Sequence, residues 1–304
     1  MKIAVIGAGA MGSLFGGLLT ESGVEVWLLD IWEAHVNTLN QSGLTIEREG
    51  ITRVVRPNAV TDPQSIGKVD LVIVFVKSTH TAAAAKTAAE LVRSDGSVLT
   101  LQNGMGNADI LSQAVAPGKV LAGTTSHGAT LLGPGQIRHA GIGPTRIGPW
   151  AAGDPAPAQK VARVLTDAEI ETKVTDDVHA LIWHKLFINV GINAITALTG
   201  IHNGQILDLA ATRDLSQKAV EEAMSVARAK GINVEKDVVD HVFQIAEATA
   251  ANRSSMGQDV DNRRPTEINA INGAVVREAR QWGVPTPINA TLTALVETLQ
   301  AHYG

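Results

Sequence analysis

The first thirty residues constrain the fold of this chain more than any other stretch. Residues 2–6 form a short, β-branched apolar run, which is typical of a buried strand in a parallel sheet. A glycine-rich hexapeptide, residues 7–12, follows at once, and residues 13–20 then show the pattern of a helix. Residues 24–29 predict a second strand, which ends at Asp30. A strand, a tight turn, a helix and another strand predict a βαβ unit of a parallel sheet.

The residue types in this unit suit the binding of a dinucleotide. Gly7 permits a tight turn, Gly9 lets a pyrophosphate approach the backbone, and Gly12 lets the helix pack closely on the strand. The N-terminus of the helix directs free N–H groups and a partial positive charge at the phosphates. Asp30 stands about twenty residues past the glycines, where an acid can bind the adenosine ribose. The predicted cofactor-binding residues are therefore Gly7, Ala8, Gly9, Ala10, Met11, Gly12 and Asp30.

The same run has an alternative interpretation as a secretion signal, because Lys2 precedes small and apolar residues up to Leu19. Three glycines at fixed spacing serve no purpose in such a signal. The hydrophobic period also changes from that of a strand to that of a helix within the run. We therefore interpret the segment as part of the folded protein.

The overall composition argues against several classes of function. With 304 residues, of which 45% are hydrophobic, the chain is long enough for two well-buried domains. A net charge of −5 and an aromatic content of only 3% argue against a nucleic-acid partner or an anionic membrane surface. There is no cysteine, and the nine histidines show no metal-ligand spacing. We expect a cytoplasmic protein that holds no metal.

Strands and helices alternate through the first half of the chain, which predicts a doubly wound sheet. Further strands are expected at residues 69–76, 97–101, 119–125 and 169–174, a β-hairpin at 44–55, antiparallel structure around 133–148, and helices at 32–41, 81–91 and 159–167. Strand patterns then vanish, and helices are expected at 178–198, 206–209, 211–230, 236–251, 266–281 and 287–301. The predicted fold class is α/β, with a Rossmann-type domain at residues 1–175 and an all-α domain at residues 176–304.

One helix in the second half carries a polar stripe. Lys185, Asn189 and Asn193 are spaced four residues apart and share one face of an otherwise apolar helix. These groups would be costly in hydrocarbon, so residues 181–198 are not expected to span a membrane. The stripe could be a partly exposed face from which the lysine reaches water. Alternatively, it lines a cleft in which a desolvated lysine of lowered pKa donates a proton and two carboxamides hold substrate oxygens.

Other polar clusters are less specific when taken alone. Residues 252–259 offer hydroxyls and N–H groups that could bind a carboxylate or cap a helix. Glu267 could contact a ligand or simply favour the N-terminal dipole of its helix. His127 follows a predicted strand, and a hydrogen-bonded structural role explains it better than catalysis does.

The chain resembles the ketopantoate reductase (2-dehydropantoate 2-reductase) family over essentially its whole length. The resemblance rests on residues 7–12, 76–77, 103–106, 123–127, 183–186 with Asn189 and Asn193, 203–204, 254–256 with 258–259, and 266–268. It implies an oxidoreductase that passes a hydride between a nicotinamide and C2 of a branched 2-keto or 2-hydroxy acid. The expected partner is this small molecule, and the sequence leaves the oligomeric state open, a homodimer included.

The resemblance also implies roles for individual residues. Lys185 would be the general acid, with Glu267 as a second catalytic residue. Substrate binding is implied for Asn103, Lys185, Asn189, Asn193, Asn203 and Ser255, and cofactor contact for Lys77, Asn103, Ala129 and Glu267.

The stretch after the second predicted strand departs from the family pattern. Members that use NADPH typically carry an arginine there for the 2′-phosphate, whereas this chain has Asp30, Ile31 and Trp32. His35 offers only a weak phosphate contact, because an unperturbed histidine is mostly neutral at neutral pH. We therefore expect NAD(H) to be preferred, with NADP(H) as a possible second cofactor. Two alternatives stay open: an NAD-dependent D-2-hydroxyacid dehydrogenase of the D-mandelate type, and a nucleotide-sensing module without turnover.

Overall fold

The computed structural model describes residues 1–303, which form two compact units. The first unit holds Met1–Gln102 and Asn107–Val178. The second holds Asn103–Gly106 and the chain from His179 onward. The segment Asn103–Gly106 therefore belongs to the second unit, although it follows a strand of the first unit in the chain.

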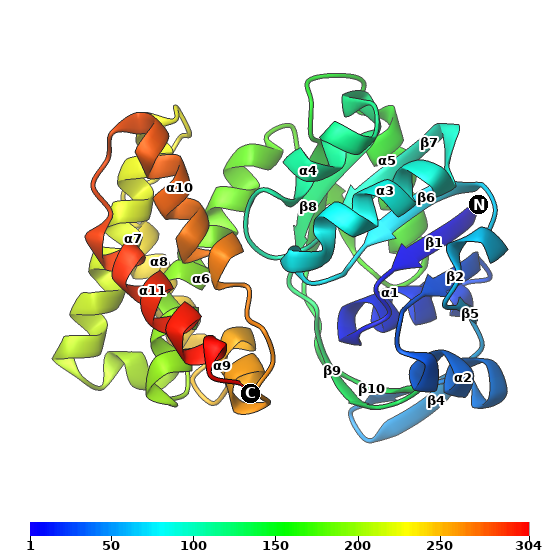
Figure 1. Ribbon diagram of the computed structural model, residues 1–304, viewed down its shortest axis with the longest axis horizontal. Helices are drawn as coiled ribbons and strands as arrows, with labels where there is room; N and C mark the ends of the chain where they lie inside the picture. The colour runs from blue at the N-terminus through cyan, green and yellow to red at the C-terminus, as the bar shows by residue number, and fades with distance from the viewer. Residues whose placement is uncertain (304) are drawn as a thin grey trace. The chain divides into compact units, whose positions relative to one another are not determined.

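An eight-stranded sheet forms the centre of the first unit (Figure 1). Its order is β12-β11-β8-β7-β6-β1-β2-β5, with bounds β1 Lys2–Ile6, β2 Glu25–Leu29, β5 Asn58–Val60, β6 Val69–Val74, β7 Val92–Thr100, β8 Val120–Thr125, β11 Thr145–Pro149 and β12 Thr172–Val174. In the order of the sheet, the strands from β5 to β8 are parallel, and β12 is parallel to β11. Among the described residues of this sheet, only β11 pairs antiparallel, with β8. The direction of winding reverses at β1, and ligands of such sheets bind at the carboxyl ends of the strands at this point.

A second, four-stranded sheet has the order β4-β3-β10-β9, with bounds β3 Leu44–Arg48, β4 Ile51–Val55, β9 Gly128–Gly133 and β10 Gln136–Gly141. The predicted hairpin is confirmed, since β3 pairs antiparallel with β4. Helix α1, Ala10–Glu21, packs against both sheets. A Cβ on Gly16 would collide with Leu28 of β2, and one on Gly17 with Ile46 of β3. These two glycines let the helix lie close to both sheets.

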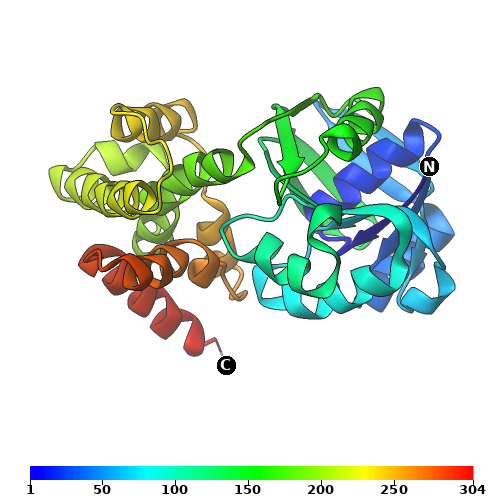
Figure 2. The ribbon, with the colours of Figure 1, turned by 90° about the horizontal axis from the view of Figure 1, so that it is seen from above.

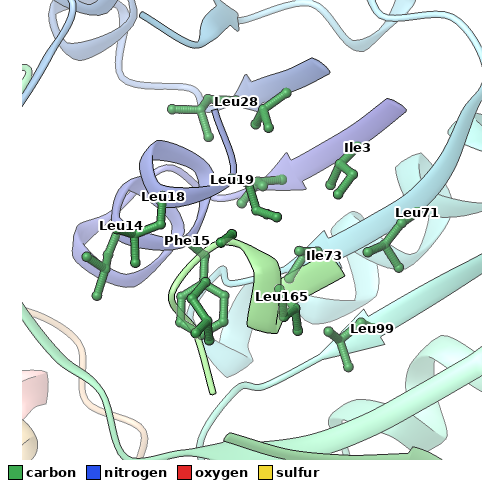
Figure 3. Close-up of a cluster of buried hydrophobic side chains, with 14 of the residues drawn as sticks. Ile3, Leu14, Phe15, Leu18, Leu19, Leu28, Leu71, Ile73, Leu99 and Leu165 are labelled. Carbon is green, nitrogen blue, oxygen red and sulfur yellow. The ribbon is translucent and has the colours of Figure 1, made fainter. Parts of the chain in front are cut away.

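Helices cover the main sheet, with bounds α2 Glu33–Ser42, α3 Thr81–Leu91, α4 Asn107–Ala114 and α5 Ala156–Asp167. Helices α3 and α4 pack over β6, β7 and β8 (Figure 1). Figure 3 shows the hydrophobic cluster beneath α1, in which Leu14, Phe15, Leu18 and Leu19 of the helix gather with Ile3, Leu28, Leu71, Ile73 and Leu99 of the strands and Leu165 of α5. This burial of apolar area holds the glycine-rich turn of α1 against the sheet.

In the described part of the second unit all regular structure is helical, with bounds α6 Val178–Thr199, α7 Ala210–Ala229, α8 Val238–Ala248, α9 Ser255–Asp261, α10 Asn272–Trp282 and α11 Pro287–Ala301. Helices α10 and α11 run side by side in both views (Figures 1 and 2). The α/β fold class with a helical second half is thus confirmed. Helix α6 is long and apolar enough to be a candidate membrane span, but 61% of its most apolar window is buried inside the protein, as in a core helix.

Local structure differs from the sequence expectation in several places. Helix α4 was not predicted, whereas α9 begins within residues 252–259, where the sequence fits either a loop or the start of a helix. Short 3-10 turns occur at Pro63–Ser65, Ser78–His80, Pro117–Lys119, Gly204–Leu207 (η4) and Ile268–Ala270 (η5). The single helix predicted at residues 266–281 is wrong, because it breaks between η5 and α10. The Ala270 carbonyl accepts a hydrogen bond from the Met105 N–H at 2.8 Å, and Ala274 N–H bonds to Ile271 instead. At Ile271 the backbone leaves the helical region, with a φ of −105° and a ψ of −96°, which interrupts the ladder of helical hydrogen bonds.

Candidate active site

The glycine-rich turn has the geometry that its sequence predicts. Gly7 has a φ of 92°, and a Cβ there would lie 2.7 Å from the Val76 nitrogen. A Cβ on Gly12 would overlap the Gly7 carbonyl oxygen. Both positions therefore require glycine for conformation or close packing.

Gly9 is different, because a Cβ there would meet no atom within 4 Å. It is the N-cap residue of α1, and no side chain caps this helix terminus. The space beside Gly9 is therefore open, and the first N–H groups of the helix carry a partial positive charge. These residues fit a dinucleotide pyrophosphate, whose approach a side chain on Gly9 would hinder.

Asp30 lies directly after β2 and is tied to the turn. Its Oδ2 accepts a hydrogen bond from the Ala8 N–H at 2.7 Å, and its Oδ1 accepts one from the Trp32 N–H at 2.9 Å. A carboxylate offers about four acceptor sites, so both oxygens retain capacity for a ligand hydroxyl. The next residue, Ile31, is 90% exposed.

Two histidines near this region are buried and hydrogen-bonded within the protein. His35 is fully buried and its Nδ1 accepts from the Gly135 N–H, so the weak phosphate contact expected of it is wrong. His127 is also buried, with its Nδ1 3.1 Å from Nε2 of His139. Burial lowers the pKa of all three rings, which favours their neutral forms.

Two further predicted cofactor residues belong to the first unit. Lys77 follows β6 and precedes the 3-10 turn Ser78–His80, at the carboxyl edge of the sheet. Ala129 lies in β9, opposite His139 of β10. Their contact with a cofactor stays a prediction.

Lys185 lies on α6 in the second unit, one turn before Asn189. Burial lowers the pKa of its ammonium from 10.5 to about 8, while the nearby Glu267 carboxylate acts in the opposite direction. Glu267 is itself 9% exposed and lies just before η5. A lysine with a pKa near neutrality both holds a proton at physiological pH and releases it readily, as a general acid must.

Three of the predicted substrate-binding asparagines present buried amide atoms that make no hydrogen bond within the described residues. They are Nδ2 of Asn189, Nδ2 of Asn193 and Oδ1 of Asn203. The other amide atom of Asn203 donates to the Thr249 hydroxyl at 3.0 Å, which holds the side chain in place. An unsatisfied buried polar group costs about 1–3 kcal/mol, so proteins keep few of them. These three amide atoms are therefore candidates for contact with a polar ligand.

The structure also brings Asn103 to this unit. Its Nδ2 lies 3.5 Å from Oε2 of Glu267, 164 residues further along the chain. Gly104, with a φ of 80°, could not carry a Cβ because it would overlap Ala270. This contact was not predicted from the sequence, in which Gly104 and Gly106, both with positive φ, are the local signal for it.

The hydroxyls of the 252–259 segment divide between two roles. Ser254 is buried and caps α9, since its Oγ accepts from the Gly257 N–H at 3.0 Å and lies 2.6 Å from Thr196 Oγ1 of α6. Arg253 donates to the Thr196 carbonyl at 2.6 Å, which fastens the segment to the end of α6. Ser255, the predicted substrate contact, is exposed at the first position of α9. Within residues 1–303 no three potential metal-ligating side chains gather.

Comparison with known proteins places this arrangement in a family. The family model described as "Ketopantoate reductase PanE/ApbA" matches residues 3–152, and its C-terminal counterpart matches residues 177–300. A 2-dehydropantoate 2-reductase from Halobacterium salinarum is 40% identical over 302 residues, with 99% of each chain covered.

Solved structures agree over the same length. A ternary structure of D-mandelate dehydrogenase with NADH and anilino(oxo)acetate has a TM-score of 0.93 at 30% identity, covering 100% of this chain and 99% of the other. A PanE/ApbA family ketopantoate reductase from Ralstonia eutropha JMP134 has a TM-score of 0.91 at 33% identity, with the same coverage. The chain therefore belongs to the ketopantoate reductase family and is a 2-dehydropantoate 2-reductase-like oxidoreductase with a Rossmann-type nicotinamide-binding unit.

Proposed function

We propose that this oxidoreductase reduces the C2 ketone of a branched 2-keto acid, 2-dehydropantoate in the first place, to the 2-hydroxy acid. One observation supports this most. Helix α6 carries both a lysine whose pKa is lowered to about 8 and two asparagines whose buried Nδ2 atoms have no hydrogen-bond partner among the described residues. A bound nicotinamide supplies the hydride.

Each of the other site side chains has a separate role in the proposed reaction, which follows from its chemistry. The Lys185 ammonium donates a proton to the ketone oxygen as negative charge develops there. Glu267 favours the protonated state of that lysine. The Nδ2–H groups of Asn189 and Asn193 donate to the carbonyl and carboxylate oxygens. The Oδ1 of Asn203 is an acceptor, so it favours a substrate that carries a hydroxyl, as 2-dehydropantoate does.

A matched pair of substrates tests this assignment. NADH oxidation is followed with 2-dehydropantoate and with 3,3-dimethyl-2-oxobutanoate, which has the same carbon skeleton without the hydroxyl. We expect kcat/KM to be about tenfold or more higher for the first, because the second leaves a buried acceptor unpaired. In Asn203→Ala the difference should shrink. Binding of cofactor without oxidation by any 2-keto acid would instead support the nucleotide-sensing alternative.

We further propose that the enzyme prefers NADH to NADPH. The carboxylate of Asp30 can accept from the ribose hydroxyls, whereas it would repel the 2′-phosphate of NADPH. The following residues Ile31, Trp32 and Glu33 bring no cation. Wild type should therefore favour NADH in kcat/KM by about tenfold or more.

Asp30→Ala should move the ratio of kcat/KM for NADH and NADPH toward NADPH. The control is Glu33→Gln, a conservative change of the next acidic residue, which should leave the ratio nearly unchanged. Absolute binding of both cofactors should weaken in Asp30→Ala, because the Ala8 and Trp32 N–H groups lose their acceptor. A wild-type preference for NADPH would overturn the proposal.

A second candidate is an NAD-dependent D-2-hydroxyacid dehydrogenase of the D-mandelate type. It is favoured by the TM-score of 0.93 to a D-mandelate dehydrogenase that holds NADH, together with the acidic Asp30. A higher kcat/KM for phenylglyoxylate than for 2-dehydropantoate would select this candidate.

A further inference from the structure

His35 on α2 connects the glycine-rich turn to the second sheet. Its ring is fully buried, and its Nδ1 lies 3.0 Å from the backbone nitrogen of Gly135, in the turn between β9 and β10. A backbone N–H can only donate, so Nδ1 must accept and carries no proton. The ring is therefore neutral with its hydrogen on Nε2.

The hydrogen on Nε2 is available for a bond to Ser13. Nε2 lies 3.2 Å from the Ser13 hydroxyl oxygen, and the Ser13 hydroxyl donates to the Ala8 carbonyl at 2.7 Å. Since the serine hydrogen is used on Ala8, the serine oxygen accepts from His35. The direction of every bond from Gly135 through His35 and Ser13 to Ala8 is thus determined, and the His35 ring also interacts directly with the Ala8 backbone.

Ala8 is held from its other side as well. Its N–H donates to Oδ2 of Asp30, whose Oδ1 accepts from the Trp32 N–H. The Trp32 ring stacks on His35 with centroids 5.3 Å apart and planes 6° apart. Both backbone polar groups of Ala8, the residue between Gly7 and Gly9, are therefore fixed by side chains from α1 and the end of β2.

We infer that His35 is a positioning residue for the dinucleotide. Through Ser13 it holds the Ala8 carbonyl and so keeps the turn 7–12 in the conformation that presents the N-terminus of α1 to a pyrophosphate. A turn that is already ordered loses less conformational entropy when the ligand binds, so affinity rises. The inference rests on the proposed function only in taking a nicotinamide dinucleotide as the ligand.

We call the chain of hydrogen bonds from Gly135 through His35 and Ser13 to Ala8 the relay. Two uncharged substitutions of His35 each break one end of this relay and keep the other. In His35→Asn the amide oxygen can reach the place of Nδ1, which keeps the bond from Gly135 and loses the link to Ser13. In His35→Gln the longer side chain can place its amide near Nε2, which keeps the link to Ser13 and loses the bond from Gly135. Each variant loses one hydrogen bond, so their thermal stabilities should fall by similar amounts.

The readout is the Kd of NADH, measured by fluorescence titration of the folded variants without keto acid. We expect His35→Asn to raise Kd about tenfold and His35→Gln to stay within about threefold of wild type. Ser13→Ala should also raise Kd, but by no more than His35→Asn, which in addition loses the direct interaction of the ring with the Ala8 backbone. The double variant should weaken binding no further than His35→Asn, because both changes break the same relay.

The outcomes distinguish this inference from the proposed function. Equal Kd values in His35→Asn and His35→Gln, whether raised or not, would show a purely structural role and overturn the inference. A wild type that binds NADH but reduces no keto acid would overturn the proposed function alone. Absence of binding of NADH and NADPH to wild type would overturn both.

Discussion

At the scale of single residues, the ammonium of Lys185 gives the most direct test of the proton transfer. Lys185→Ala should lower kcat by ~10²–10⁴-fold with little change in the Kd of NADH, because general acid catalysis contributes about that much. Lys173→Ala, an exposed lysine of β12, is the control and should keep wild-type kinetics. A Lys185→Ala enzyme that retains more than about half of the wild-type kcat would remove the lysine from this role.

The pH dependence follows from the same group. Only the protonated ammonium can donate, and its pKa is lowered by burial to about 8. The kcat/KM for reduction should therefore be level at neutral pH and fall about tenfold per unit well above pH 8. Oxidation of the hydroxy acid, which needs the free amine, should show the opposite trend. A reduction rate that stays level up to pH 10 would contradict the assignment.

Two buried asparagines are expected to have different roles, one in binding the ligand and the other in stabilising the fold. Asn193 has a buried amide nitrogen with no partner among the described residues. Asn289, also buried, donates to the Ala219 carbonyl at 2.9 Å and to Glu222 at 2.8 Å. Asn193→Ala should raise KM for the keto acid without loss of stability, whereas Asn289→Ala should lower the free energy of unfolding by about 1–3 kcal/mol. Urea unfolding and steady-state kinetics on both variants measure this, and a destabilised Asn193→Ala with wild-type KM would place Asn193 in the scaffold.

At the scale of elements, the start of α1 contains one glycine that is needed for folding and another that is needed for ligand binding. Gly12→Ala should strongly destabilise the protein, because its Cβ would overlap the Gly7 carbonyl oxygen. Gly9→Ala should fold normally, because Gly9 has a φ of −62° and open space around its Cβ position. It should nevertheless raise the Kd of NADH about tenfold or more by obstructing the pyrophosphate. Thermal unfolding and NADH titration distinguish the two, and unaltered NADH binding in Gly9→Ala would place the phosphates elsewhere.

At the scale of the whole molecule, buried histidines set the response to acid. Burial lowers the pKa of His35, His127 and His139, with Arg48 adding to the effect on the last two. The unfolded chain therefore binds protons below about pH 6.5 that the folded chain rejects. Stability should be fully present above pH 6.5 and decline as pH falls toward the folded-state pKa values, at up to about 1.4 kcal/mol per unit for each histidine.

This decline is checked by Tm measurements between pH 5 and 8. His127→Gln should flatten the dependence, because it removes one buried titrating ring, whereas His241→Gln on the exposed side of α8 should not. A wild-type Tm that does not change below pH 6.5 would show that these rings accept protons in the folded state.

Much of the fold followed from the sequence because it depends on local chemistry. The turn at residues 7–12 needs glycines for its positive φ and close packing. The central strands are recognisable because they are short apolar runs, rich in β-branched residues and bounded by turn residues. The stripe of Lys185, Asn189 and Asn193 is visible because helical periodicity alone puts the three residues on one face.

The tertiary structure decided what depends on contacts between distant segments. Asn103 lies next to Glu267, 164 residues further along the chain, and the Met105 N–H bonds to the Ala270 carbonyl at the point where the predicted helix breaks. The relay from His35 to Ala8 likewise joins three elements whose spacing carries no pattern. Local propensity determines which turns and helices form, but the partner of a carbonyl or an imidazole is selected by packing, because a buried polar group must be satisfied by whatever the fold brings near it.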